Sequence, residues 1–461
     1  PETCGACHRG ILEEWQGSAH GELWRAGGDE GAVCTTCHSS HAVERPYQRE
    51  TRLKNPETCG NCHEESLASY RDSFHGQVTD LGFVTAATCS DCHTPHANLP
   101  AANPAASIHP DNLAATCGQC HQGVTPAFLS FDPHAEPANR AKGPGLWAVW
   151  LFMTALLVAV FAFFGLHTLL WLQRAIVALS RGELEHERTL EGPWVRRFRP
   201  GQLRIHAVVI VTFLVLAATG LPLKFHSAEW AQTLLAWPGG VALARFLHRT
   251  AALVTFGYFL VHLAMILKRA LVEREPGMFY GWNSMMPRPK DLADLWANLR
   301  YFLYLGPRPR FDRWTYWEKF DYFAVFWGVA IIGASGLLLW FPEAASRAVP
   351  GWALNAAYVI HSDEALLAVG FIFVFHFFHT HLRPEAFPMD PVIFLGAMPL
   401  ERFRAERPLE YRRLVERGAL EERLVPAPSP ERLRAARIWG LSAVAVGLVL
   451  VAGILWGFLG H

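Results

Sequence analysis

Three things are scarce in this sequence. The stretch from Pro1 to Arg140 contains too few large apolar side chains to form an ordinary hydrophobic core. The charges balance, with 41 Lys and Arg against 41 Asp and Glu, so the net charge gives no argument for nucleic-acid binding. All ten cysteines lie in Cys-x-x-Cys-His motifs, so none is left over for a structural disulfide. The N-terminal part must therefore fold around a core that the polypeptide itself does not supply.

The motif Cys-x-x-Cys-His occurs five times between Cys4 and His134. Its cysteines are Cys4, Cys7, Cys34, Cys37, Cys59, Cys62, Cys89, Cys92, Cys117 and Cys120, and its histidines are His8, His38, His63, His93 and His121. Two thiols at this spacing can form thioethers with the vinyl groups of one haem, and the neighbouring imidazole can bind the iron. Zinc sites would instead need paired Cys-x-x-Cys motifs or further His ligands. The sequence therefore predicts five covalently bound haem c groups, which would supply the missing core.

The motifs belong to an internal repeat. A shift of the sequence that superimposes Cys4 on Cys59 also superimposes His20 on His75. The same shift places Cys34 on Cys89 and His41 on His96. A repeat of fixed period indicates a repeated structural unit, and the unit here is a cassette that carries two haem motifs. A third half-copy begins at Cys117 and ends near His134.

The repeat also nominates the second axial ligands. An electron carrier of low potential usually has His on both faces of the iron, which leaves no open position for a substrate. The predicted sixth ligands are His20, His41, His75, His96 and His134. His109 has no counterpart in the repeat, and it is either an alternative ligand or a loop residue. Which ligand serves which haem stays open, because a distal His often comes from another cassette.

From residue 146 the sequence contains long apolar runs that can cross a bilayer. Six spans are predicted, at residues 146–172, 205–225, 246–267, 322–341, 361–381 and 438–459. The predicted fold is a haem-packed domain of helices and loops at residues 1–135, a linker at 136–145, and an all-α bundle of six transmembrane helices with cytoplasmic loops at 146–461.

The basic residues predict the orientation of the spans. The loops after spans one, three and five are rich in arginine, and these arginines include Arg188, Arg196, Arg197, Arg308, Arg310, Arg404 and Arg412. Segments 227–244 and 342–360 together hold only Arg347. Positive charge stays cytoplasmic, so we expect the N-terminal domain to be periplasmic and the protein to lie in the inner membrane. Haem c is attached outside the cytoplasm, so we also expect an export signal to have preceded Pro1.

Histidines recur at matched depths within the spans. An ionisable residue inside a membrane is costly and is a functional candidate. His248 and His262 lie roughly four helical turns apart on one span, and His361 and His376 have one more residue between them on another. These positions predict two stacked, non-covalent haem b groups. The outer haem would take His248 with His361, and the inner haem would take His376 with either His262 or His206, which lies near the start of the second span.

The region from Arg204 to His381 resembles the cytochrome b subunits of membrane formate dehydrogenases and nickel-iron hydrogenases. The resemblance lies in Arg204-Ile205-His206 with Thr219-Gly220 downstream, in His248-Arg249, and in the paired His of a later span. It implies that His206 and His376 hold the cytoplasmic haem. The sequence departs from that family in an additional first span, in His262, and in one more residue between His361 and His376. The whole chain is similar to multihaem cytochrome c and dihaem cytochrome b fusion proteins of quinol-linked respiratory chains.

These observations predict a membrane-bound electron-transfer protein. Quinol would be oxidised in the bundle, and electrons would pass through two haems b and five haems c to a periplasmic protein. Arg383, Glu385 and Asp390, just past span five, could line a cytoplasmic quinone pocket or could only anchor the helix. An alternative is an anchor and relay subunit, in which a periplasmic hydrogenase or molybdoenzyme supplies electrons for quinone reduction. A catalytic multihaem reductase would need a haem with an open position, and the number of candidate distal His argues against it.

Overall fold

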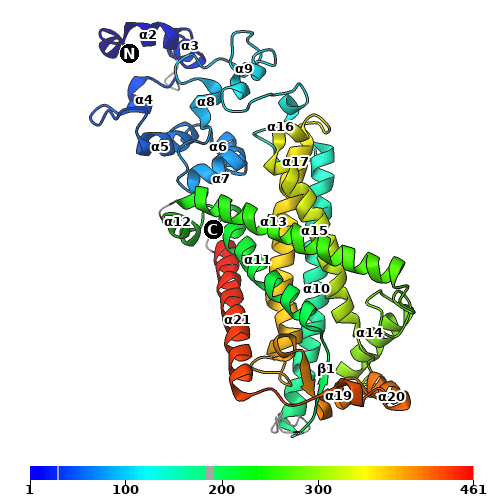
Figure 1. Ribbon diagram of the computed structural model, residues 1–461. Coiled ribbons are helices and arrows are strands. Elements are labelled where there is room, and N and C mark those ends of the chain that lie inside the picture. The colour runs from blue at the N-terminus through cyan, green and yellow to red at the C-terminus, as the bar shows by residue number, and fades with distance from the viewer. Residues whose placement is uncertain (28–30, 183–191, 238, 460–461) are drawn as a thin grey trace. The chain divides into compact units, whose positions relative to one another are not determined.

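The computed structural model describes residues 1–27, 31–182, 192–237 and 239–459, and it is mostly helical (Figure 1). The predicted fold class is confirmed. Arg188, which contributes to the predicted orientation, lies outside the described residues. The chain divides into two compact units. The first comprises Pro1–Phe152, Gly220–Arg245 and Ser335–His361, and the second comprises Met153–Thr219, Phe246–Ala334 and Ser362–His461. The predicted domain boundaries at residues 135 and 145 stay predictions.

Short helices joined by turns form the N-terminal part. They are α1 (Glu2–Gly5), α2 (Arg9–Gln16), α3 (Ala19–Arg25), α4 (Cys34–His38), α5 (Arg49–Gly60), α6 (Glu64–Arg71), α7 (Phe74–Asp80), α8 (Cys89–His93), α9 (Leu113–Gly118) and the 3₁₀ helix η1 (Phe128–Ser130). Helices of this length bury little apolar surface and are marginal without tertiary packing. The fold of this part therefore depends on what the helices enclose.

The sequence repeat is a structural repeat. The Ser18 hydroxyl accepts from the Gly21 backbone N–H at the start of α3, and Ser73 accepts from Gly76 in the same way at the start of α7, both at 3.2 Å. Each bond satisfies a backbone donor at the first turn of a helix. Both glycines also lie against a backbone carbonyl, so that a Cβ at Gly21 would fall 2.1 Å from the oxygen of Trp15. The matched spacing of Ser and Gly in the two copies thus has a packing reason.

Six helices of the described residues are long and apolar enough to cross a membrane. They are α10 (Pro144–Ser180), α11 (Pro200–Lys224), α13 (Gly240–Leu267) continued by the π-helical η2 (Lys268–Val272), α15 (Tyr316–Trp340), α17 (Trp352–Gly370) continued by the π-helical η3 (Phe371–His376) and η4 (Phe378–Leu382), and α21 (Pro430–Leu459). The six predicted spans are confirmed. The helices are longer than the predicted apolar runs. Hydropathy identifies only the part of a helix that suits the interior of the bilayer, and each helix continues beyond that part.

The connecting segments carry short elements. They are α12 (Glu229–Leu235), α14 (Pro289–Phe302), α16 (Pro342–Ala345), α18 (Val392–Leu395), α19 (Leu400–Glu406), α20 (Pro408–Glu416) and the 3₁₀ helix η5 (Glu421–Arg423). Strands β1 (Trp194–Arg196), β2 (Ala397–Pro399) and β3 (Leu424–Val425) form an antiparallel sheet in the order β2-β1-β3. Val195 of β1 and Phe403 of α19 are fully buried in its core. The sheet holds three distant loops together.

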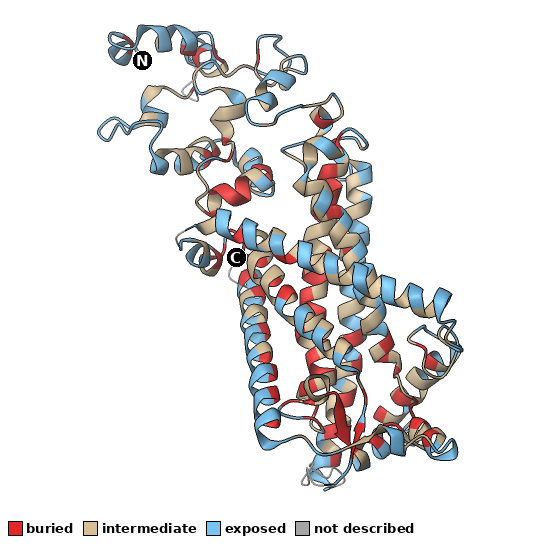
Figure 2. Ribbon diagram, viewed as in Figure 1, coloured by how far each residue is buried: buried red, intermediate tan, exposed pale blue. Residues whose placement is uncertain are grey.

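Within the second unit, α21 packs against the π-helical part of α17. A Cβ at Gly447 of α21 would lie 2.5 Å from Phe377 and 2.7 Å from Phe373, so those two aromatic rings occupy the space that a side chain would need. Figure 2 shows buried positions spaced along α21, and Gly447 is one of them. Close approach at a glycine fixes the separation of the two helices.

Candidate haem sites and the cavity beside His376

The haem motifs have helical local structure. Two of them, at Cys34–His38 and Cys89–His93, each form a single helical turn, α4 and α8. None of the ten cysteines forms a disulfide. Thiols of different motifs lie close together: the nearby Cys89 thiol lowers the pKa of Cys59, and burial followed by the nearby Cys59 thiol raises the pKa of Cys37. Neighbouring motifs therefore stand side by side.

Four of the five motif histidines face a predicted distal histidine. The imidazole centres are 6.3 Å apart for His20 and His63 and 6.2 Å apart for His38 and His96. The same separation recurs between His75 and His121 at 6.2 Å, and between His93 and His134 at 6.3 Å. Sequence reasoning nominated these residues but could not pair them. Each pair joins residues far apart in the sequence.

These separations fit a haem iron between the two rings. A metal–nitrogen bond of about 2 Å on each side, with roughly 1 Å from each nitrogen to its ring centre, separates two axial imidazoles by about 6 Å between centres. Burial, followed by the His63 imidazole, lowers the pKa of His20, and burial with His121 lowers that of His75. A lowered pKa keeps the imidazole neutral, which is the form that binds a metal.

Three predicted c-haem residues are not part of such a pair. His8 and His41 are exposed, and neither ring lies against another imidazole within the part of the chain that the structure describes. Nδ1 of His109 accepts from the backbone N–H of Asp111 at 3.3 Å. The structure thus brings together eight of the predicted axial histidines and leaves the motif at Cys4 without an evident partner.

In the two outer membrane histidines, Nδ1 lies within hydrogen-bond distance of a hydroxyl group on another helix. Nδ1 of His248 lies 2.9 Å from the Thr219 hydroxyl, which itself donates to the carbonyl of Val215 and therefore accepts from the imidazole. Nδ1 of His361 lies 3.4 Å from the Ser335 hydroxyl. A histidine that binds a metal usually donates its other ring N–H in this way. In His248 this arrangement points to Nε2 as the atom that would bind a metal.

The candidate ligands of the inner haem, His376 and His262, differ in which ring nitrogen is hydrogen-bonded. His376 donates from Nδ1 to Asp321 Oδ2 at 2.9 Å, whereas Nε2 of His262 is hydrogen-bonded to the Tyr322 hydroxyl at 2.9 Å. His206 and His376 line one cavity, and His262 does not line it. The geometry therefore favours His206 over His262 as the partner of His376.

The π-helical segment η3 accounts for the spacing of His361 and His376. A π-helical turn holds more residues than an α-helical turn, because its bonds run between residues five apart. Segment η3 ends at His376. It lies between His361 and His376, so this part of the span holds more residues per turn than an α-helix would. Single π-helical turns are frequent at functional sites.

The cavity has a volume of about 240 Å³. Its lining includes Arg383, Glu385 and Asp390, which the sequence analysis proposed for a pocket. It also includes His379, which sequence reasoning missed. The His379 side chain is only 3 % exposed, and neither ring nitrogen has a hydrogen-bond partner among the described residues. A buried polar group without a partner requires an explanation. The signal available in the sequence was a further histidine three residues after His376.

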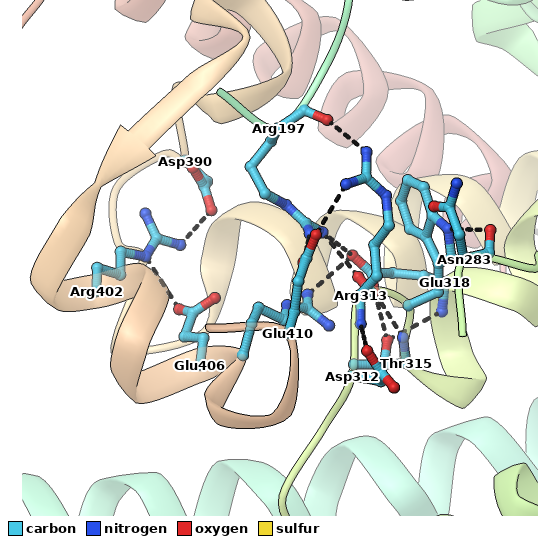
Figure 3. Close-up of polar contacts among 12 residues, drawn as sticks. Arg197, Asn283, Asp312, Arg313, Thr315, Glu318, Asp390, Arg402, Glu406 and Glu410 are labelled. Atoms are coloured by element: carbon cyan, nitrogen blue, oxygen red, sulfur yellow. Dashed lines mark hydrogen bonds and ion pairs between the residues drawn. The ribbon is translucent and has the colours of Figure 1, made fainter. Parts of the chain in front are cut away.

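Charged side chains form part of the lining of this cavity, and Figure 3 shows contacts that Asp390 and Glu406 make. Arg402 forms ion pairs with both Asp390 and Glu406, and Arg383 binds Glu406 at 3.1 Å. Burial alone would raise the pKa of Glu406, but the nearby arginines Arg402, Arg383 and Arg407 hold it below its ordinary value. Glu406 is therefore ionised over the physiological pH range.

A second carboxylate organises the adjoining loops. Glu410 is fully buried and accepts from Arg197 at 2.9 Å, from Arg313 at 2.8 Å and from Arg423 at 3.2 Å. Figure 3 shows Arg197 and Arg313 converging on it. A buried charge is stable only where it is paired and hydrogen-bonded. Arg197, one of the arginines that predicted the orientation, thus also helps to fix the loops against one another.

The family described as "Doubled CXXCH motif" matches residues 26–68, which contain the motifs at Cys34 and Cys59. No curated protein matches the sequence. The motif supports covalent binding of haem c, and the six apolar helices indicate association with a membrane. Together they indicate a membrane-bound electron-transfer protein that carries haem c motifs.

Proposed function

We propose that the protein oxidises quinol in the cavity beside His376 and delivers the electrons to a periplasmic acceptor protein. In this proposal the five motifs hold haem c, while His248 with His361 and His206 with His376 hold two haems b. When bound, haem supplies reversible one-electron chemistry, and the chain supplies ligation, spacing and electrostatics. The distribution of arginine supports an inner-membrane location with the haem c domain on the periplasmic side.

One observation carries the proposal. His379 is buried with both ring nitrogens unpartnered among the described residues, and it lines the same cavity as the candidate ligands His206 and His376. A quinol hydroxyl is the kind of group that would satisfy it. Apolar lining from Trp171 and Phe302 suits the quinol ring, since ligand pockets combine apolar walls with a few polar groups.

Oxidation of quinol releases protons as well as electrons, so the cavity needs a proton acceptor. The His379 imidazole can hydrogen-bond the hydroxyl and accept its proton. Glu385 also lines the cavity, and its Oε2 is buried without a hydrogen-bond partner in the described part of the chain. In this proposal Glu385 receives the proton next.

The test is quinol-driven reduction of the purified protein in lipid nanodiscs, followed by absorbance. We expect His379→Leu to slow reduction by quinol roughly 100-fold, which is a typical loss for a proton-transfer group. The spectrum after reduction by dithionite should not change. The control is His262→Leu, which removes a histidine bonded to Tyr322 and should leave the rate unaltered. Reduction of His379→Leu at the original rate would exclude this cavity. The reverse direction would show itself as faster oxidation by quinone than reduction by quinol.

A further inference from the structure

Three of the four histidine pairs follow two rules. In the first rule, the distal His early in a cassette faces the first motif of the next cassette, as in His20 with His63 and His75 with His121. In the second rule, the second motif of a cassette faces the distal His at the end of the next one, as His38 faces His96. His93 faces His134, which by its place after Cys117 corresponds to His20 and His75 rather than to His96, so this pair also crosses to the next copy but does not repeat the second rule. Every pair therefore crosses from one cassette to the next.

Two residues of the first cassette then have no partner imidazole among the described residues. His8 belongs to a first motif, and by the first rule its iron would take a distal His from the cassette before it. His41 is a distal His at the end of a cassette, and by the second rule it would bind the iron of a second motif in the cassette before it. The two gaps are complementary, and both point to the same neighbour.

Pairing of His8 with His41 inside the chain would break the repeat. The shift that superimposes the two cassettes relates His8 to His63 and His41 to His96. The structure pairs neither of these counterparts with the other, because His63 faces His20 and His96 faces His38. The second copy of the repeat therefore argues against a pairing of His8 with His41 in the first copy.

His109 is a poor substitute. Its segment is tied to the fourth motif, since the Ser107 hydroxyl donates to the carbonyl of Cys92. That motif already has His134 opposite His93. The surface beside His41 is also apolar and open, with Val43 70 % exposed and Tyr47 89 % exposed. Large apolar side chains left this exposed are typical of a surface that contacts another protein segment.

We propose that the haem at Cys4 and Cys7 receives no distal imidazole from this chain, and that His8 and His41 form a joint with a further two-haem cassette of the same repeat. That cassette donates a histidine to the His8 iron and receives His41 at its own second motif. The added cassette is either joined ahead of the first one or carried by another molecule. The inference rests on the haem ligands of the proposed function, but not on its quinol chemistry.

The test is the spin state of the haems in the purified, monomeric protein of this sequence, read by electron paramagnetic resonance and magnetic circular dichroism. We expect one high-spin haem c among five, converted to low spin by added imidazole. His41→Ala should leave the number of low-spin haems unchanged. The matched variant His96→Ala removes the corresponding residue of the second cassette and should create a second high-spin haem c.

Two results would overturn the inference: five low-spin haems c in the monomer, or a new high-spin haem in His41→Ala. Either could occur while quinol still reduces the protein, so the two proposals can fail separately. Repeating the measurement at rising protein concentration identifies the source of the cassette. A constant high-spin signal assigns it to a cassette joined ahead of the first or to another protein. A signal that disappears on self-association would also contradict the proposal, because the second motifs at His38 and His93 of a second copy already face His96 and His134.

Discussion

Asp321 of α15 accepts a hydrogen bond from Nδ1 of His376 at 2.9 Å, while the next residue, Tyr322, hydrogen-bonds Nε2 of His262 at 2.9 Å. Two adjacent residues thus give two membrane histidines opposite roles. Asp321 leaves Nε2 of His376 available for a metal, whereas Tyr322 hydrogen-bonds Nε2 of His262. The contrast permits a matched pair of variants.

Asp321→Asn should weaken haem b binding at the inner site. Loss of a carboxylate behind a metal-binding imidazole makes that imidazole a poorer donor, and such changes typically cost about 10- to 100-fold in metal affinity. The measurement is the haem b content per protein by pyridine haemochrome, with haem c as the internal standard. Tyr322→Phe is the control and should retain both haems b. Equal retention in the two variants would contradict the role given to Asp321.

Gly336→Ala should displace the His361 imidazole. A Cβ at Gly336 would lie 2.9 Å from Cε1 of His361, which is closer than real Cβ contacts. We expect loss of one of the two haems b or a changed low-spin signal from it. Gly328→Ala lies on the same helix, where a Cβ would meet nothing within 4 Å, and it should behave like the original protein. An unchanged haem b spectrum in Gly336→Ala would exclude His361 as a ligand.

His75→Ala should convert one haem c to high spin, because its imidazole faces that of His121 at 6.2 Å. Covalent attachment through cysteine keeps the haem in place, so the total haem c content should stay constant. The readout is the high-spin signal at a fixed protein concentration. His109→Ala has no paired imidazole to expose, and we expect it to add no high-spin haem.

The loop cluster around Glu406 should make stability depend on pH. The pKa of Glu406 is held below its ordinary value of 4.5 by the surrounding arginines. A depressed pKa in the folded state adds stability above about pH 4.5 and loses it as the pH falls below that value. The thermal midpoint should therefore decrease on acidification. Glu406→Gln should flatten this dependence below pH 4.5 and cost roughly 3 kcal/mol at neutral pH, since it removes the carboxylate that pairs with the buried Arg383.

Most of the fold could be predicted from the sequence, because it depends on local patterns. The six apolar runs and the repeat of Ser18, Gly21 and their counterparts are visible without a structure. The three-stranded sheet could not be predicted, since β1, β2 and β3 have two or three residues each and pair over long distances. Strands that short give no periodicity to recognise.

Only part of the candidate site could likewise be predicted from the sequence. The identity of the axial histidines follows from motif and repeat, but their pairing does not, because cross-cassette contacts depend on how the cassettes pack. The choice between His206 and His262 likewise depends on a hydroxyl group from another helix, Tyr322. His379 escaped notice because its unpartnered nitrogens are a property of the packed bundle alone.

Helix α21 holds none of the candidate ligands, yet Gly447 receives the rings of Phe373 and Phe377, which flank His376 in sequence. Helix α21 thus packs against the π-helical segment that carries His376. A bulkier residue at position 447 would push on that turn from behind. A substitution at Gly447 could in this way change the orientation of the His376 imidazole, although Gly447 contacts neither the metal site nor the cavity.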